Sequence, residues 1–197
     1  MRAAYAQAKT VYQELRAALT PWAKSHGFRR WSGTQAGWRK AIHAAQILGF
    51  KFEGYSMVDP DVGNSLTGLV QLDPSSSPGA TPIRQAPFSC CLVGAELDQL
   101  ARIQGAINQR RPPIPLYLAK DAREDSLLGH YLRTLYQGVP EYREGEVVEL
   151  AYHSIDDVRD LARFISAVLP AALDRFLEGR VAQPIDTTPP HLRPKWL

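Results

Sequence analysis

Basic and aromatic side chains alternate along one short stretch near the amino terminus of this 197-residue chain. Lys and Arg side chains neutralise phosphates, and flat aromatic rings stack on unpaired bases. The pattern between residues 24 and 40 therefore indicates a surface for nucleic acid or another polyanion. Its members are Lys24, His26, Phe28, Arg29, Arg30, Trp31, Trp38, Arg39 and Lys40.

The charge of the chain is divided unevenly. The first 51 residues hold nine Lys or Arg and a single Glu, a net charge of +8. The other 146 hold 14 basic and 19 acidic residues, a net charge of −5. A concentrated positive field attracts polyanions. It would equally attach the amino-terminal quarter to the acidic remainder of the same chain, and we expect Asp156, Asp157 and Asp160 to form these internal pairs. Polyanion binding is the alternative interpretation.

Strand geometry limits how many of these side chains one ligand could contact. Residues 28–32 have the pattern of a short strand, and successive side chains of a strand point to opposite faces. Phe28 and Arg30 should therefore face one way. Arg29 and Trp31 should face the other way, which places at least one aromatic ring in the core. The residues we consider for a binding site are Arg29, Arg30, Trp31, Trp38, Arg39, Lys40 and, near the carboxyl terminus, Trp196.

No catalytic or metal-binding pattern appears elsewhere in the sequence. The five histidines are scattered, and none has another at the spacing of three or four that places two ligands on one helix face. Residues 59–65 are similar to a calcium loop only in composition, since the glycine is fifth rather than sixth and the twelfth position is Val70. The adjacent Cys90 and Cys91 are expected to be small buried residues rather than a redox pair. We therefore expect no metal, no cofactor and no catalytic residue.

The composition is that of an ordinary globular protein, with 45% hydrophobic and 22% charged residues. No apolar run approaches the roughly 18 residues that a membrane span requires. The amino terminus also lacks the apolar centre of a signal peptide. We expect a soluble, cytoplasmic protein that does not enter a membrane.

Four segments have the three-and-four spacing of apolar residues that is typical of an amphipathic helix. Pro21 should either kink the first helix or, with Thr20 as the cap, start a second short one. Gly27 suits the left-handed position that ends a helix. Ser154, with Asp157 three residues later, resembles a capping box at the start of the last helix. The four segments begin near Tyr5, Leu97, Leu127 and Val158 and end near Trp22, Ile107, Leu135 and Phe176.

Alternating patterns predict strands between these helices. Residues 38–48 are open to two interpretations, because their alanines and leucine would also fit one face of a helix. The segment 73–89, with four prolines and four serines, is expected to be a long loop. The expected strands are a hairpin formed by residues 28–32 and the stretch from Trp38, and further strands over residues 50–53, 66–72 and 146–152.

These elements predict an α+β fold, an antiparallel sheet packed against the amphipathic first and last helices, with a helical insertion in the middle. Two apolar helical stripes and the apolar faces of the strands have only each other to bury against. We expect one domain over residues 1–179, in which residues 73–139 are an insertion made of a loop and helices. A proline-rich tail should follow over residues 180–197.

The order of these features resembles a bacterial family called domain of unknown function 4304. The similarity covers roughly residues 12–73 and 146–178, and the middle section departs from it. It implies an α+β fold in a bacterial cytoplasmic protein, and it carries no catalytic residue over. The residues that carry it are Leu15, Leu19, Pro21, Gly27-Phe28-Arg29-Arg30, Trp38-Arg39 and the start of the last helix from Asp156-Asp157 to Leu161.

The expected function on these grounds is binding rather than catalysis. No nucleophile–base pair, metal spacing or cofactor loop can be identified. We therefore expect a module that binds an unknown protein partner, either through the tail ending in Trp196-Leu197 or through the long central loop. The alternative is single-stranded nucleic acid bound by the basic aromatic hairpin over residues 24–40. A second alternative is an enzyme whose site assembles from residues distant in the sequence.

Overall fold

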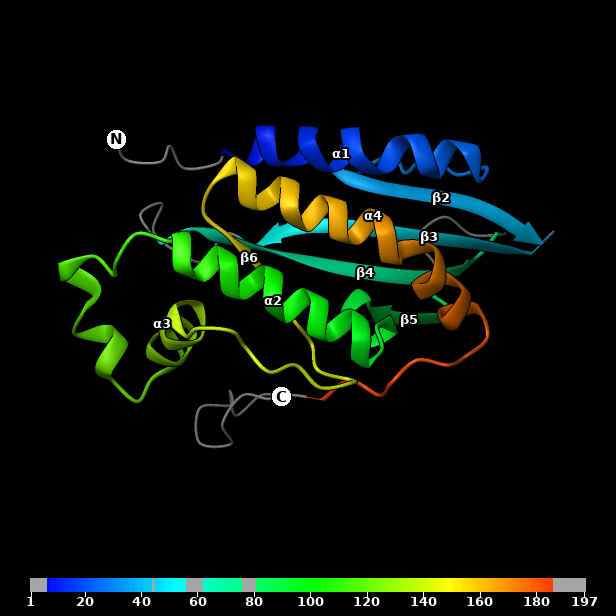
Figure 1. Cartoon of the computed structure of the whole chain (residues 1–197). Helices are drawn as coiled ribbons and strands as arrows, with labels where there is room; N and C mark the ends of the chain where they lie inside the picture. The colour runs from blue at the N-terminus through cyan, green and yellow to red at the C-terminus, as the bar shows by residue number, and fades with distance from the viewer. Residues whose placement is uncertain (1–6, 44, 56–61, 76–80, 186–197) are drawn as a thin grey trace.

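An antiparallel sheet carries the long helices on one face, in a computed structural model that describes residues 7–43, 45–55, 62–75 and 81–185. Figure 1 shows α1 and α4 side by side over the sheet, with α2 next to α4. The elements are α1 (Ala8–Ser25), β1 (Arg29–Arg30), β2 (Ala36–His43), β3 (Gln46–Tyr55), β4 (Asn64–Pro74), β5 (Arg84–Pro87), η1 (Phe88–Cys91), α2 (Gly94–Arg110), η2 (Leu116–Leu118), η3 (Asp121–Arg123), α3 (Leu127–Tyr136), β6 (Leu150–Tyr152) and α4 (Ile155–Leu177).

The described strands form one six-stranded sheet in the order β1-β2-β3-β4-β5, and β6 pairs with the beginning of β4. Every pairing is antiparallel. Residues 38–48 were open to two interpretations; of these, residues 38–43 belong to β2 and residues 46–48 belong to β3. Trp38 lies opposite Phe50, and Lys40 lies opposite Leu48. The strand form gives β2 and β3 partners for their backbone groups on both sides, β1 and β3 for β2, and β2 and β4 for β3.

The main core lies between one face of the sheet and the helices. Large apolar side chains at alternate strand positions point toward the helices, as the period of two requires. Each helix contributes one apolar stripe. This arrangement confirms the expected α+β fold. The fully buried residues include Trp38, Phe50, Phe52, Leu66 and Val70 from the strands and Leu15, Leu19, Leu161, Ile165 and Phe176 from α1 and α4, all at most 1% exposed.

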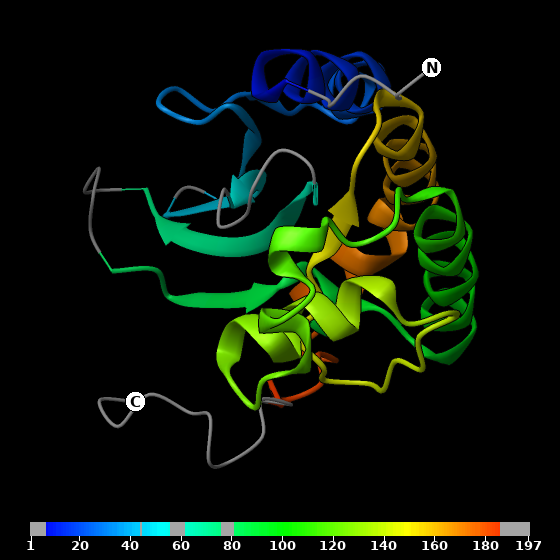
Figure 2. The same ribbon diagram turned by 90° about the vertical axis from the view of Figure 1, so that its left-hand side faces the viewer.

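The opposite face of the sheet is only partly covered. A second apolar cluster, in which Leu132 and Leu135 of α3 meet Val62 and Ala151, covers the corner next to β6. Over β1, β2, β3 and the second half of β4, no helix of the described residues lies on this side (Figure 2). We call this region the open face. Its side chains include Arg29, Arg39, Ala41, Lys51 and Gln85.

The helices follow the local signals of the sequence with one exception. Gly27 ends α1 with a φ of 81°, the left-handed conformation that glycine tolerates best. Thr20 does not begin a second helix, because α1 continues through Pro21. Leu19 and Ala23, both buried, hold the two halves of α1 against the core on either side of the proline. No helix within the described ranges is long and apolar enough to cross a membrane.

Two strand predictions need correction. The segment 73–89 is not only a loop, because Arg84–Pro87 forms β5 and pairs with β4. The strand expected over residues 146–152 is shorter, since only Leu150–Tyr152 pairs with β4. Both differences depend on pairing with β4, which neighbouring residues in the sequence do not reveal.

Candidate functional site

The β1–β2 hairpin sorts the basic and aromatic residues onto the two faces of the sheet. Arg29 lies opposite Arg39, and Arg30 lies opposite Trp38. Because faces alternate along a strand, Arg29 and Arg39 share the open face, whereas Arg30 and Trp38 share the face that carries the helices. Both open-face arginines are exposed.

Trp31 lies over the open face, the side of the sheet that also carries these two arginines. Its ring occupies the space above Gly49, where an added Cβ would stand 2.8 Å from the ring atom Cζ3. Gly49 is the direct cross-strand neighbour of Arg39. The ammonium of Lys51 lies 5.9 Å from the centroid of the Trp31 ring. The ring remains partly exposed. This half-buried aromatic shares the open face with three cations, Arg29, Arg39 and Lys51.

The residues on the helix side have structural roles. Trp38 is 1% exposed, and its ring stacks on Phe50 with the centroids 5.2 Å apart. The guanidinium of Arg30 covers the Trp38 ring at 5.4 Å. Arg30 also donates hydrogen bonds to the carbonyl groups of Gly37, Thr34 and Gln35. Trp38 is therefore a core residue, and Arg30 closes the hairpin; neither is placed to contact a ligand on the open face.

Lys40 also points to the helix side, where its ammonium lies 5.7 Å from the centroid of Phe28. Trp196 lies outside the described residues, and so do residues 59–61 of the turn that has the composition of a calcium loop. Among the described residues, no three His, Cys, Asp or Glu side chains are grouped closely enough to hold a metal ion. The part of the predicted site that the structure brings together is Arg29, Trp31 and Arg39.

The internal charge pairing expected for the amino-terminal quarter was wrong. Among its described basic residues, only Lys51 forms an ion pair, 3.0 Å from Glu53 on the same strand. Its single acidic residue, Glu14, is bound by Arg159 of α4 at 2.9 Å. The cations of the open-face hairpin, Arg29 and Arg39, have no carboxylate partner in the described part of the chain.

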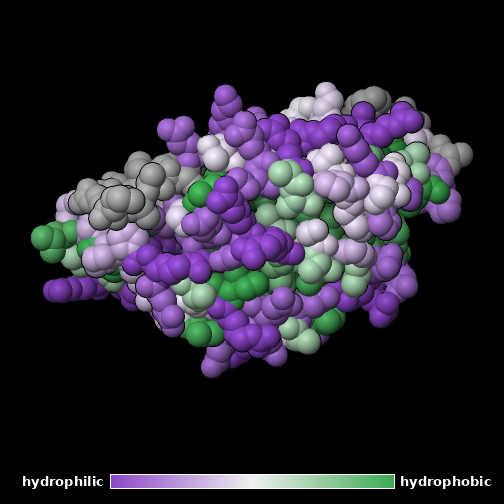
Figure 3. Space-filling view, turned by 45° about the horizontal axis from the view of Figure 1, so that its top comes forward, coloured by the Kyte–Doolittle hydropathy of each residue, from purple (hydrophilic) through white to green (hydrophobic). Residues whose placement is uncertain are grey.

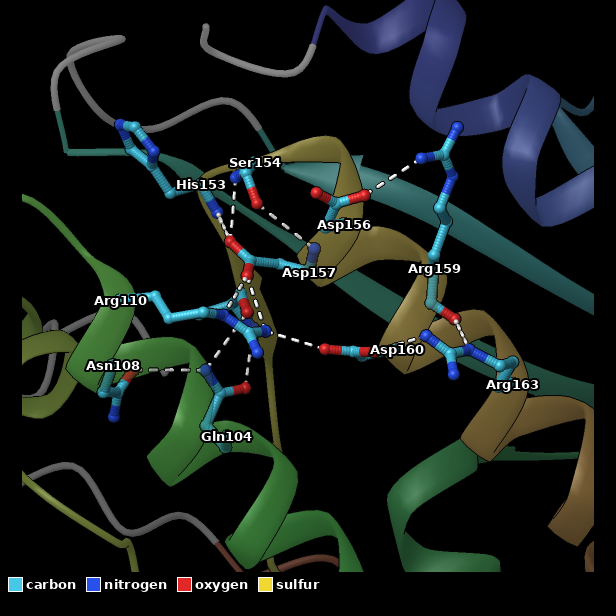
Figure 4. Close-up of polar contacts among 11 residues, drawn as sticks. Gln104, Asn108, Arg110, His153, Ser154, Asp156, Asp157, Arg159, Asp160 and Arg163 are labelled. Atoms are coloured by element: carbon cyan, nitrogen blue, oxygen red, sulfur yellow. Dashed lines mark hydrogen bonds and ion pairs between the residues drawn. The ribbon is translucent and has the colours of Figure 1, made fainter. Parts of the chain in front are cut away.

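The three acidic residues that were expected to neutralise this quarter are bound by arginines of α2 and α4 instead (Figure 4). Arg110 of α2 lies 2.9 Å from Asp157 and 2.7 Å from Asp160. Asp156 pairs with Arg159 three residues later on α4, and Asp160 pairs with Arg163 in the same way. The arginines of α2 and α4 are closer to these carboxylates than the hairpin is, because they lie on the same helix or on a helix packed against it. They therefore form the ion pairs.

Arg111 is a buried cation that the sequence did not single out. It is 7% exposed, caps the carboxyl end of α2, and donates from Nη1 to the backbone carbonyl of Val62. Its guanidinium lies 5.8 Å from the centroid of Tyr136. Burial lowers the pKa of Arg111. A cation at a helix carboxyl end is stabilised by the helix dipole, which suits a role in holding α2 to the sheet.

The helical side of the molecule offers a shallow groove between α2 and α4, of about 430 Å³. Ile103, Ala106 and Phe164 form its apolar floor, and Arg102, Asp160 and Arg163 lie at its rim. Figure 3 looks onto this layer and shows apolar residues confined between polar ridges. Because the rim carries both signs of charge, this groove does not resemble a polyanion site.

Comparisons with family models, with curated proteins and with solved structures found no match to this chain. The similarity to domain of unknown function 4304 therefore stays a prediction.

Proposed function

We propose that the protein binds single-stranded nucleic acid on the open face of its sheet. The observation that carries the proposal is the placement of Arg29, Arg39 and Trp31. Two exposed arginines without a described carboxylate partner share the open face with a half-buried indole. A sheet with helices on one face and cationic and aromatic side chains on the other is a surface that RNA-binding proteins use for unpaired bases.

Each of the three residues has a distinct role in this proposal. Arg29 and Arg39 neutralise neighbouring phosphates and hold the backbone of the strand without reading its sequence. Trp31 stacks on one base, and it can do so only when the base is unpaired, since duplex bases are stacked on each other. Gly49 has no side chain and so leaves free the space over the sheet that the indole occupies.

The proposal predicts salt-dependent binding that depends on the two arginines. Fluorescence anisotropy with labelled single-stranded DNA and RNA should show affinity that falls steeply as salt rises, because counterions are released from the strand. Arg29→Ala and Arg39→Ala should each weaken binding several-fold on all sequences, and each should reduce the logarithmic salt slope by about 1. Trp31→Ala should cost about 1–3 kcal/mol of binding energy.

A matched control separates this surface from a general charge effect. Arg102 is exposed on α2, on the helical side, so Arg102→Ala removes the same charge without touching the open face. If Arg102→Ala weakens binding as much as Arg29→Ala does, or if the wild type does not bind single strands at low salt, the proposal is wrong.

A protein partner is the second candidate, favoured by two apolar side chains on the surface. Leu116 is 93% exposed and Tyr117 is 58% exposed, next to each other in η2. Adjacent exposed apolar residues are typical of contact sites for other proteins. A pull-down from native cells, carried out with and without nuclease digestion, should retain a partner in both cases, and Leu116→Glu should abolish its capture. Loss of all captured proteins after digestion would assign the interaction to nucleic acid.

A further inference from the structure

A second cationic and aromatic surface lies at the end of α1, on the other side of the same hairpin. The ring of His26 stacks on Trp22, with the centroids 4.5 Å apart and the planes 24° from parallel. Trp22 is partly buried against Phe28 and Phe50, whereas His26 is exposed. The stack is therefore anchored in the core at one end and faces solvent at the other.

The orientation of His26 is fixed by its own hydrogen bonds. Its ring atom Nδ1 lies 2.9 Å from the carbonyl oxygen of Trp22 and 3.1 Å from the hydroxyl of Ser25. An aromatic ring that is held in place loses little conformational entropy when another ring stacks on it. The outer surface of His26 is thus a prepared position for one more flat group.

Two lysines supply positive charge at this end of α1. Lys24 lies in the last turn of α1, and the Lys40 side chain passes close to Gly27, 3.5 Å from the position of an added Cβ. Neither forms an ion pair with a described residue. The carboxyl end of a helix is otherwise unfavourable for phosphates, because the helix dipole is negative there. Lys24 and Lys40 offset that field.

This second surface is continuous with the open face. Lys40 follows Arg39 directly in β2, and the two side chains point to opposite faces. β1 is only two residues long. Phe28 precedes it, and Gly27, which has no side chain, precedes Phe28. A chain of phosphates passing from Arg29 to Lys40 therefore has only this short edge to cross.

We infer that a nucleic-acid strand bound on the open face passes around the edge of the sheet at β1 and places a further base on the exposed ring of His26. The inference rests on the proposed function and extends it to a longer footprint. A short strand fills the Trp31 position alone, whereas a longer one also reaches the Trp22–His26 stack. Affinity per strand therefore rises with length until both positions are occupied.

The test compares oligothymidylates of about 5 and about 15 nucleotides, within the range of footprints known for small single-strand-binding folds. The wild type should bind the longer strand more tightly. His26→Ala should weaken binding of the longer strand by about fivefold or more and leave the shorter strand unaffected. His26→Phe, which keeps a flat ring, should restore the binding of the longer strand. His130→Ala, a histidine change on α3, is the matched control and should have no effect on either strand.

Thermal unfolding of each variant shows whether His26→Ala acts through stability, since His26 also caps the end of α1. The inference is wrong if the affinity of His26→Ala rises from the shorter to the longer oligonucleotide as much as that of the wild type. It is also wrong if His26→Phe binds the longer oligonucleotide as weakly as His26→Ala. The loss caused by Arg29→Ala would then still support binding on the open face. If the wild type binds neither oligonucleotide, the proposed function and the inference both fail.

Discussion

At the scale of single residues, neighbours of the same type have opposite fates in this protein. Arg29 reaches solvent on the open face, whereas Arg30 is tied to hairpin carbonyls and covers a core ring. Trp31 lies over a glycine, whereas Trp38 is buried between the sheet and the helices. Strand alternation alone separates them, because consecutive side chains point to opposite faces. Residue type is therefore a poor guide to function in this hairpin.

The two tryptophans should differ sharply in their effects on stability. Trp38→Ala removes a fully buried ring that stacks on Phe50, and it should lower the free energy of unfolding by about 3–5 kcal/mol. Trp31→Ala removes a partly exposed ring and should lower it clearly less. Urea denaturation followed by circular dichroism measures both changes. Equal losses would show that Trp31 is also a core residue and would remove the stacking position from the proposed site.

At the scale of elements, the start of α4 is fixed by a buried carboxylate. Asp157 accepts hydrogen bonds from the backbone N–H groups of His153 at 3.0 Å and Ser154 at 2.8 Å, and it also binds Arg110. Ser154 in turn accepts from the N–H of Asp157, which completes the capping box that the sequence predicted. The carboxylate thus joins α4 to β6 and to the end of α2 (Figure 4).

This carboxylate should make stability depend on acid. Burial by itself would raise the pKa of Asp157, but the hydrogen bonds from Ser154, His153 and Arg110 outweigh it and lower the pKa. The folded-state pKa is thus below the unfolded value of about 3.9. The contribution of ionised Asp157 to the free energy of unfolding is complete above the unfolded value. It is lost as pH falls through the folded-state pKa.

Asp157→Asn should therefore lower the free energy of unfolding by about 1–2 kcal/mol at neutral pH. Its stability should also fall less than that of the wild type between neutral pH and about pH 3. Urea titrations at both pH values measure the difference. If the stabilities of the two proteins fall in parallel as pH is lowered, Asp157 does not contribute to the loss of stability in acid.

At the scale of the whole molecule, the main core connects elements from both ends of the sequence. The η1 turn lies between β4, β5 and α4, and it holds Cys90 and Cys91, each 1% exposed. Burial raises the pKa of Cys91 to about 12, which keeps the thiol protonated and unreactive at ordinary pH. Both cysteines are free, as expected for small buried residues.

The thiols should consequently report on global unfolding. A thiol-specific disulfide reagent at about pH 8 should label neither cysteine in the folded protein and both in denaturant. The denaturant midpoint of labelling should coincide with that of circular dichroism, because the thiols become accessible only when the core opens. Rapid labelling of the folded protein would show that η1 opens independently of the sheet and helices.

The sequence by itself determined the four long helices and the fold class of this protein. Helix periodicity, the capping box at Ser154 and the left-handed position at Gly27 act between residues that are neighbours in the chain. They predicted the helix ends closely, except for the alternative in which Thr20 starts a second helix. Alternation likewise predicted that the hairpin would divide its basic and aromatic residues between two faces, one of them facing the core.

Only the tertiary structure decided which charges meet and which surface remains open. The expected pairing of the basic quarter with Asp156, Asp157 and Asp160 failed because those carboxylates lie nearer to Arg110, Arg159 and Arg163. Short-range ion pairing depends on distance in space, and net charges summed along the chain contain no such distance. The strand β5 and the shortening of β6 depended in the same way on β4 as a partner. The binding surface that we propose follows from these tertiary contacts: the acidic residues are bound elsewhere, and Arg29, Trp31 and Arg39 remain on the open face.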